Sequence, residues 1–215
     1  EEWNGLKFID SDGCFINENK NQKLLENFDK NLNYPKSDYT GKILDKREAI
    51  SLFIESLFDL DFIDINSIKD RNFKVVIDTV NGANFSILPT ILKKLNCDVV
   101  EVFCNNSGVF DRNPEPIAEN LNILSKKVIE EKADIGFACD PDGDRLSIVD
   151  NKGNAIGEEN TLVLCADSFY EETNSNSPLI TNLSSSMCLD FIASKHNREI
   201  FRSAIGEANV IELMK

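Results

Sequence analysis

The sequence predicts an α/β protein built from three-layer α/β/α units with mainly parallel sheets. Two observations indicate this fold class. Short β-rich runs alternate with helical stretches through the centre of the chain, in the order strand, helix, strand, helix, strand. The order strand, helix, strand begins again after the polar, proline-terminated stretch 172–178, which indicates a linker. Because parallel strands need crossover connections, the intervening helices are expected to cover the faces of the sheets.

The first 63 residues contain two predicted helices and one predicted turn. Ser11-Asp12-Gly13 lies between two short apolar runs and is typical of a hairpin turn. Residues 18–31 and 46–63 carry large apolar side chains at helical spacing, which predicts a helix in each stretch. The polar stretch 32–45 between them, with one proline and one glycine, indicates a linker.

The centre of the chain supplies the main predicted sheet. Strands are expected at 73–77, 98–103, 134–139 and 146–149, with helices around 87–95, 117–131 and 158–171. The fourth strand follows the third after a short loop, so these two are expected to run antiparallel. A second α/β unit is expected from strands at 179–183 and 199–203, with helices at 186–195 and from Glu207.

Composition and charge exclude several classes of protein. The 215 residues are 41% hydrophobic and 28% charged, an ordinary globular balance that argues against a disordered chain. The 23 basic and 37 acidic residues give a net charge of −14, which repels phosphate backbones, so no nucleic-acid partner is expected. No apolar stretch approaches the roughly 18 residues of a membrane helix, so no membrane partner is expected. A small phosphorylated ligand in a locally positive pocket stays compatible with this charge.

Cysteine and histidine usage narrows the chemistry. Six cysteines are scattered without a C-x-x-C pair, at positions 14, 97, 104, 139, 165 and 188. Most lie in apolar runs, which predicts buried, reduced thiols in a cytoplasmic protein rather than a disulfide framework or a zinc site. The single histidine, His196, excludes catalysis by several histidines.

The acidic loop 140–145, DPDGDR, is the strongest local signal for chemistry, and it directly follows an apolar strand. Alternate residues of an extended chain face the same side, so Asp140, Asp142 and Asp144 can converge on one point. Three carboxylates that close repel one another unless a hard cation neutralises them, and oxygen ligands suit Mg²⁺ or Ca²⁺. The spacing therefore favours a metal site.

Two other structures could account for an acidic loop of this kind. An EF-hand loop would need glycine at its sixth position and glutamate at its twelfth, where Arg145 and Asn151 stand, and it would need flanking helices rather than strands. That arrangement is excluded. An acidic turn that merely joins two strands is the remaining alternative.

The loop within ADIGFACDPDGDRLSIVD resembles the metal-binding loop of the α-D-phosphohexomutases, the superfamily of phosphoglucomutase, phosphomannomutase and phosphoglucosamine mutase. Other segments resemble that superfamily in the expected order. EWNGLKFIDSDGCFI resembles the segment after its catalytic serine loop, VVIDTVNGAN the start of its second domain, FDRNPEPIAENL the loop and helix before the metal strand, and LITNLSSSMCLD with IGEANVIELM the start of its third domain. Together these segments cover nearly the whole chain.

The resemblance implies a four-domain enzyme of which this chain contains one complete and two partial units. Residues 1–45 would be the C-terminal part of the first domain, 46–172 the second domain with the metal loop, and 173–215 the N-terminal part of the third. The catalytic serine, in a T-A-S-H-N-P-type loop, would lie just before Glu1, and the fourth domain would lie outside the chain. The 215 residues alone are therefore expected not to catalyse turnover.

The resemblance also implies roles for residues of the acidic loop. Asp140, Asp142 and Asp144 would hold Mg²⁺, with the phosphoserine completing its coordination shell. Arg145 would add positive charge beside the loop as a catalytic group. An ion pair between Arg145 and a loop carboxylate is the alternative, and the two roles can coexist.

Three residues outside the loop match the superfamily's substrate machinery. Lys7 matches a lysine proposed to assist proton transfer at the sugar hydroxyl, although a solvated strand lysine is equally compatible with the sequence. Gly206 and Glu207 match the third-domain loop that reaches the sugar. A helix start with an acidic first turn is the alternative for these two residues.

The resemblance thus predicts part of a Mg²⁺-dependent isomerase that moves a phosphoryl group between the 6- and 1-positions of a hexose phosphate through an enzyme phosphoserine. Glucosamine phosphate is the preferred substrate, because DPDGDRLSIVD and GEANVIELM look closer to phosphoglucosamine mutases than to typical phosphoglucomutases. Phosphomannomutase or phosphoglucomutase activity on mannose or glucose phosphate is the alternative. A truncated, non-catalytic protein that binds metal or phosphosugar is a further hypothesis.

Overall fold

A computed structural model describes residues 6–30, 41–46 and 48–215. The chain divides into two compact units, one formed by 46–175 and the other by 1–45 together with 176–215. Most of the predicted linker 32–45 lies outside the described residues. Residues 41–46 contain neither helix nor strand.

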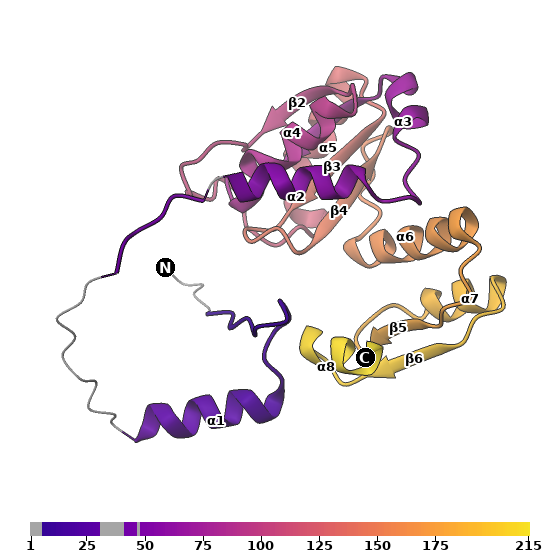
Figure 1. Cartoon of the computed structure of the whole chain (residues 1–215). Coiled ribbons are helices and arrows are strands. Elements are labelled where there is room, and N and C mark those ends of the chain that lie inside the picture. Colours follow the sequence, from indigo (N-terminus) through magenta and orange to yellow (C-terminus); the bar gives the residue numbers. More distant parts are fainter. Residues whose placement is uncertain (1–5, 31–40, 47) are drawn as a thin grey trace. The chain divides into compact units, whose positions relative to one another are not determined.

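A four-stranded sheet forms the centre of the 46–175 unit (Figure 1). Its strands are β1 (Lys74–Asp78), β2 (Asp98–Val102), β3 (Ile135–Cys139) and β4 (Leu146–Asp150), in the spatial order β2-β1-β3-β4. Strand β1 runs parallel to β2 and β3, whereas β4 runs antiparallel to β3. The mainly parallel sheet and the antiparallel fourth strand are as the sequence predicts. The carboxyl ends of β1 and β3 therefore lie side by side.

Helices cover both faces of this sheet. The helices of this unit are α2 (Glu48–Phe58), α3 (Ile65–Arg71), α4 (Ile87–Lys94), α5 (Asn122–Glu131) and α6 (Glu158–Thr173), with short 3₁₀ turns η1 (Ala83–Phe85) and η2 (Ala118–Asn120). Helices α4, α5 and α6 contact the strands directly, and α2 packs on α4. Leu124 and Val128 of α5 are fully buried against Val76 of β1 on one face of the sheet. On the opposite face, Leu92 of α4 packs against Val75 of β1. Burial of these apolar side chains on two opposite faces produces the three-layer arrangement.

Helix α5 approaches the sheet closely at Gly136 of β3. A Cβ atom at this glycine would lie 2.7 Å from Val128 Cγ2 and 3.2 Å from Val149 Cβ. The absence of a side chain at Gly136 thus lets α5 pack directly over the strand that leads into the acidic loop.

Several predicted boundaries are wrong. The helix expected over 46–63 ends at Phe58, and α3 follows as a separate helix that was not predicted. Asp64 caps α3, since its carboxylate accepts hydrogen bonds from Ser67 N at 3.0 Å and Ser67 Oγ at 2.6 Å. This cap is a sequence signal that could have revealed α3. The helix expected over 117–131 is split into η2 and α5, and α6 continues to Thr173, two residues into the predicted linker 172–178.

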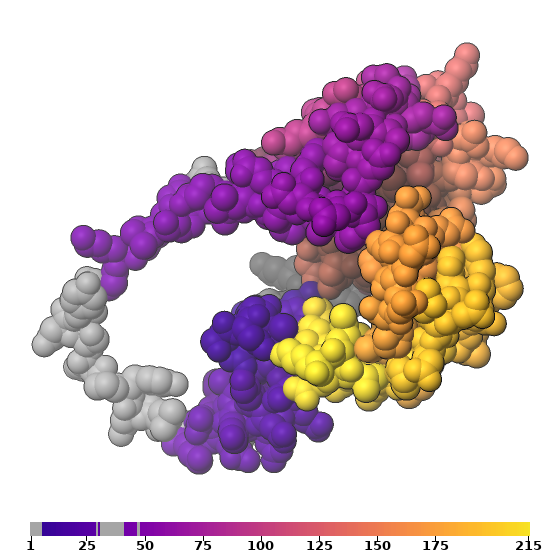
Figure 2. Space-filling view, turned by 45° about the vertical axis from the view of Figure 1, so that its right-hand side comes forward, coloured from indigo at the N-terminus to yellow at the C-terminus, as the bar shows by residue number. Residues whose placement is uncertain are grey.

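In its described residues, the other unit contains a two-stranded parallel sheet and three helices. Its elements are α1 (Glu18–Asp29), β5 (Leu179–Asn182), α7 (Cys188–Lys195), β6 (Ile200–Ser203) and α8 (Glu207–Met214). The predicted hairpin is reduced to one antiparallel bridge between Ile9 and Phe15. Helix α8 lies beside the N-terminal segment, where Asn17 Nδ2 donates to Glu212 Oε1 at 2.9 Å (Figure 2).

The six cysteines are all free, but the prediction that most are buried is wrong. Cys139 is buried, Cys14, Cys97 and Cys104 are half-buried, and Cys165 and Cys188 are exposed on α6 and α7. The apolar runs around the last two form helices, and a helix turns part of an apolar run toward solvent. Among the described residues, no helix combines the length and the apolarity that crossing a membrane requires.

Candidate metal centre

The acidic loop forms the connection between β3 and β4 of the central sheet. Asp140 directly follows β3 and is only 3% exposed, whereas Asp142 and Asp144 are exposed. One carboxylate oxygen of each of the three lies within 4.8 Å of the others. The structure therefore brings together the three aspartates that the sequence singles out, at the carboxyl end of a central strand, where open α/β sheets bind ligands.

The loop is organised around Asp140. Its Oδ1 accepts hydrogen bonds from Gly143 N at 3.0 Å and Arg145 N at 3.1 Å, and its Oδ2 accepts from Arg145 Nε at 3.1 Å. Burial raises the pKa of the Asp140 carboxyl, and the neighbouring Asp142 and Asp144 raise it further. Hydrogen bonds from Arg145 lower this pKa and offset part of the increase. A cation bound among the three carboxylates would relieve this unfavourable concentration of negative charge.

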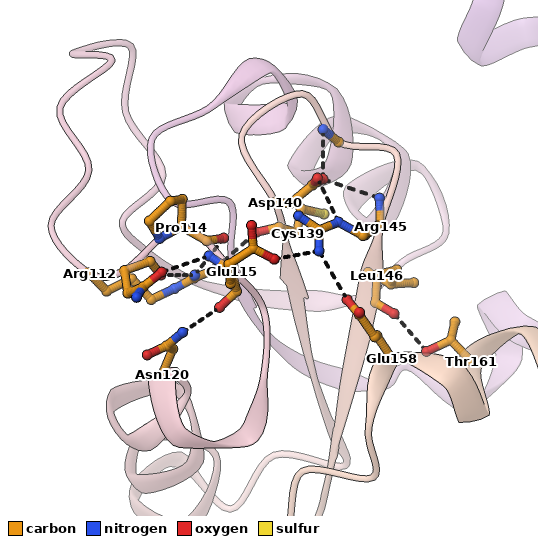
Figure 3. Close-up of polar contacts among 12 residues, drawn as sticks. Arg112, Pro114, Glu115, Asn120, Cys139, Asp140, Arg145, Leu146, Glu158 and Thr161 are labelled. Atoms are coloured by element: carbon orange, nitrogen blue, oxygen red, sulfur yellow. Dashed lines mark hydrogen bonds and ion pairs between the residues drawn. The ribbon is translucent and has the colours of Figure 1, made fainter. Parts of the chain in front are cut away.

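Arg145 pairs with carboxylates on three sides (Figure 3). Besides Asp140, its Nη1 lies 2.5 Å from Glu115 Oε2 and 3.7 Å from Glu158 Oε2. The guanidinium lowers the pKa of Glu115. Of the two roles considered for Arg145, the structure displays the ion pair with a loop carboxylate. The partners Glu115 and Glu158 lie far from the loop in sequence, so no local pattern pointed to them.

The turn after β1 contacts the acidic loop through its backbone. Ala83 N donates to Pro141 O at 2.8 Å, and a Cβ atom at Gly82 would lie 2.4 Å from that oxygen. Gly143 has a left-handed backbone with φ of 80° and faces the side-chain amide of Asn84. Glycine is required at position 82 by close approach and favoured at 143 by its conformation. Together these contacts fix the loop against the end of β1.

Two left-handed residues shape this turn. Val80 and Asn81 have φ of 49° and 55°, which is unusual for a β-branched residue such as valine. Asn81 Nδ2 donates to Val109 O and to Asp111 Oδ2, both at 2.8 Å. Asn105 N donates to Asn81 Oδ1 at 3.1 Å. These hydrogen bonds tie the turn to the loop between β2 and α5 and hold the strained backbone in place.

The remaining predicted site residues belong to the other compact unit. Lys7 is exposed, and its ammonium lies 5.8 Å from the ring centroid of Phe15. Gly206, with φ of 122°, precedes α8, and Glu207 is the first residue of that helix. Glu207 thus occupies the acidic first turn that the alternative interpretation describes, and the substrate roles of these three residues stay predictions.

The fold and the loop define a three-layer α/β/α protein with a cluster of aspartates at the end of a central strand. Residues 51–153 match the family model described as phosphoglucomutase/phosphomannomutase, alpha/beta/alpha domain II, and residues 158–215 match that of domain III. The chain therefore belongs to the phosphoglucomutase/phosphomannomutase family, within the α-D-phosphohexomutase superfamily. The domain III match begins at the first residue of α6, a helix that packs with the 46–175 unit through β4. The division at 172/173 stays a prediction.

Individual relatives agree with this assignment. The chain is 30% identical over 210 residues to a probable phosphoglucosamine mutase from Methanopyrus kandleri, covering 97% of this chain and 45% of the relative. It is 34% identical over 209 residues to a phosphoglucomutase/phosphomannomutase from Thermococcus kodakarensis, covering 96% and 45%. A crystal structure of a phosphoglucomutase/phosphomannomutase family protein from Burkholderia thailandensis superposes with a TM-score of 0.73 at 25% identity, covering 93% and 42%. The chain spans about half the length of the curated relatives it matches.

Proposed function

We propose that this chain is the central part of a Mg²⁺-dependent phosphohexomutase, which moves a phosphoryl group between the 6- and 1-positions of a hexose phosphate. The observation that carries the proposal is the convergence of Asp140, Asp142 and Asp144 within 4.8 Å in a chain of this family. The phosphoserine that carries the phosphoryl group would be supplied by a segment outside these 215 residues.

The chemistry of the donor set fits a hard dication. All three side chains are carboxylates, Asp140 is held in place by donors of the loop itself, and Asp142 and Asp144 are exposed to solvent. Mg²⁺ typically keeps several waters and takes one or two protein carboxylates together with phosphate oxygens. Three carboxylates, two of them exposed to solvent, would therefore suit a Mg²⁺ ion that also binds water and phosphate oxygens.

Each candidate site residue of the chain would have its own role in the reaction. The three aspartates would hold Mg²⁺, which supplies neutralising charge at the transferring phosphoryl group. Arg145 and Glu115 would keep Asp140 oriented toward the cation. Lys7 would assist proton transfer from the attacking sugar hydroxyl. Gly206 and Glu207 would contact the sugar.

Glucosamine phosphate is the substrate we propose, within a cytoplasmic enzyme that has no nucleic-acid or membrane partner. The supporting observations are the acidic-loop and GEANVIELM segments and several relatives named phosphoglucosamine mutase. The Thermococcus kodakarensis relative, named phosphoglucomutase/phosphomannomutase, favours glucose or mannose phosphate as the alternative.

The metal assignment is tested by titrating the chain with Mg²⁺ in a calorimeter. Asp144→Asn is expected to lower Mg²⁺ affinity by at least about tenfold, because loss of even an outer-shell partner typically weakens metal binding by about 10–100-fold. Asp98→Asn, at an exposed aspartate that begins β2, is the matched control and should bind Mg²⁺ normally. Unchanged binding by Asp144→Asn would refute the metal site.

The substrate is tested in the complete mutase that joins this chain to a phosphoserine-bearing domain. Phosphorus NMR should show glucosamine 6-phosphate converted to the 1-phosphate faster than mannose or glucose 6-phosphate. Faster turnover of either of the latter would establish the alternative substrate. Absence of turnover with all three would leave metal or phosphosugar binding without catalysis as the function.

A further inference from the structure

Arg112 is a buried arginine that neither the sequence patterns nor the proposed chemistry explain. It lies in the loop between β2 and α5, and its side chain is 6% exposed. Its Nε lies 2.7 Å from Oδ2 of Asp78, whose side chain is 1% exposed at the end of β1. Burying two charges costs hydration free energy, which is recovered only where the ion pair has good geometry and the remaining polar atoms are hydrogen-bonded. The other nitrogens of Arg112 are therefore expected to have hydrogen-bond partners.

Those donors reach two further segments of the chain. Arg112 Nη2 donates to Cys139 O at 3.0 Å, and Nη1 donates to Asn113 O at 2.8 Å and Pro114 O at 3.2 Å. Asp78 ends β1, Cys139 ends β3, and Pro114 precedes Glu115. One planar guanidinium therefore fixes the relative positions of two strand ends and of the loop that carries Glu115.

These contacts form a closed ring with the acidic loop (Figure 3). Cys139, held by Arg112, is bonded covalently to Asp140. Glu115, next to the Pro114 carbonyl that Arg112 binds, accepts from Arg145 Nη1 at 2.5 Å, and Arg145 Nε donates to Asp140 Oδ2 at 3.1 Å. Asp140 is thus held on one side through its backbone, by the contact of Arg112 with Cys139. On the other side it is held through its carboxylate, by Arg145 and Glu115, whose loop Arg112 also contacts.

We propose that Arg112 is a positioning residue for the metal centre. It holds Asp140 where the three carboxylates can share one cation, although it touches neither the cation nor the substrate. This inference rests on the proposed function, because it requires that the acidic loop bind a divalent metal. Carboxylates that repel one another in the absence of a cation must be held by surrounding contacts, and a site whose supporting residues are loose loses affinity.

The conservative variant Arg112→Lys separates positioning from simple charge pairing. Lysine can keep a positive charge beside Asp78, but its single ammonium cannot reach Asp78, Cys139 O and Pro114 O in the fixed geometry of a guanidinium. The variant should therefore stay folded, whereas the hydrogen bonds that fix the end of β3 and the loop carrying Glu115 are lost. A role in stability alone predicts a lower melting temperature with unchanged metal affinity.

The experiment uses Mn²⁺ as the probe, with the EPR signal of free Mn²⁺ as the readout and Mg²⁺ as the competitor. The 215-residue chain and its variants are titrated at a temperature where circular dichroism shows all of them folded. Arg112→Lys is expected to weaken Mn²⁺ binding by about tenfold or more, as for other outer-shell partners. Asp78→Asn, which loosens Arg112 without removing it, should weaken binding in the same direction and serves if Arg112→Lys does not fold.

Val128→Ala is the matched control. Val128 lies on α5 and is fully buried in the core between this helix and the sheet, so its truncation destabilises the same unit without altering the ring. It should leave the affinity for Mn²⁺ unchanged. Equal affinity of the Arg112→Lys and unaltered chains, or an equal loss in Val128→Ala, would overturn the positioning role alone. Failure of the unaltered chain to bind Mn²⁺ would overturn the proposed metal site and this inference with it.

Discussion

Replacing Gly82 by alanine tests how firmly the turn after β1 fixes the acidic loop. Gly82 has φ of −89° and ψ of −162°, a conformation open to alanine, so the substitution introduces no backbone strain of its own. The new Cβ would instead lie 2.4 Å from Pro141 O, 2.8 Å from Pro141 Cα and 2.9 Å from Pro141 C. All three are backbone atoms, so no side chain can rotate away to relieve the overlap.

The size of the effect follows from these distances. Ordinary van der Waals contact begins at 3.4 Å, so the Pro141 carbonyl must withdraw by about 3.4 − 2.4 = 1.0 Å. Such overpacking typically destabilises a protein by about 1–3 kcal/mol, and loss of the Ala83–Pro141 hydrogen bond adds about 0.5–1.5 kcal/mol. A domain of this size would lose about 5–15 °C of melting temperature. Displacement of Pro141 also moves its neighbour Asp140, so Mg²⁺ affinity should fall.

The assay is thermal unfolding with and without Mg²⁺, followed by circular dichroism. Gly41→Ala is the control, because a Cβ at Gly41 meets nothing within 4 Å and its backbone is not left-handed. That variant should unfold at or slightly above the temperature of the unaltered chain. An unchanged melting temperature and unchanged Mg²⁺ stabilisation in Gly82→Ala would show that the turn does not brace the loop.

Two further predictions concern the packing and electrostatics of the same unit. Gly136→Ala should lower the free energy of unfolding by about 1–3 kcal/mol in denaturant unfolding. The loss should be smaller in a Val128→Ala background, because the Val128 methyl group that lies 2.7 Å from the new Cβ is then absent. Additive effects of the two substitutions would refute this contact. Lys127 and Lys74 lower the pKa of Glu131 from 4.5 to about 2. Because the folded-state pKa is the lower one, the stability that Glu131 contributes is present above about pH 4.5 and lost as the pH falls toward 2. The melting temperatures of Glu131→Gln and the unaltered chain should accordingly converge over that interval, and a difference that persists at pH 2 would contradict the assignment.

Much of the fold follows from local patterns in the sequence. The runs 73–77 and 134–139, which contain most of β1 and all of β3, are mainly apolar, as expected for strands buried on both faces, and Leu121, Leu124 and Val128 repeat at helical spacing. Helix α3 was missed because its seven residues are too short and too polar to show a period, although the Asp64 cap marks its start.

The acidic loop could be predicted for the same reason, because its alternating aspartates lie within six consecutive residues. The residues that hold the loop in place could not be predicted in this way. Arg112 and Glu115 contact Cys139 and Arg145 across 27 and 30 residues of sequence, and Gly82 meets Pro141 only because β1 and β3 are neighbours in the sheet. Contacts of that kind depend on tertiary structure and leave no periodic trace in a single sequence.

The ring around Arg112 has a consequence for the lifetime of the folded chain. Asp78, Arg112 and Cys139 are separated by 34 and 27 residues, so the unfolded chain does not hold them together. A cation that needs the carboxylates held by these contacts would therefore bind the unfolded chain less tightly than the native state. At 100 times its dissociation constant, and with no affinity for the unfolded chain, it would stabilise the native state by about 2.7 kcal/mol, which lowers the population open to proteases about 100-fold. If the proposed metal site binds magnesium, the concentration of free magnesium would then influence how fast the polypeptide is degraded.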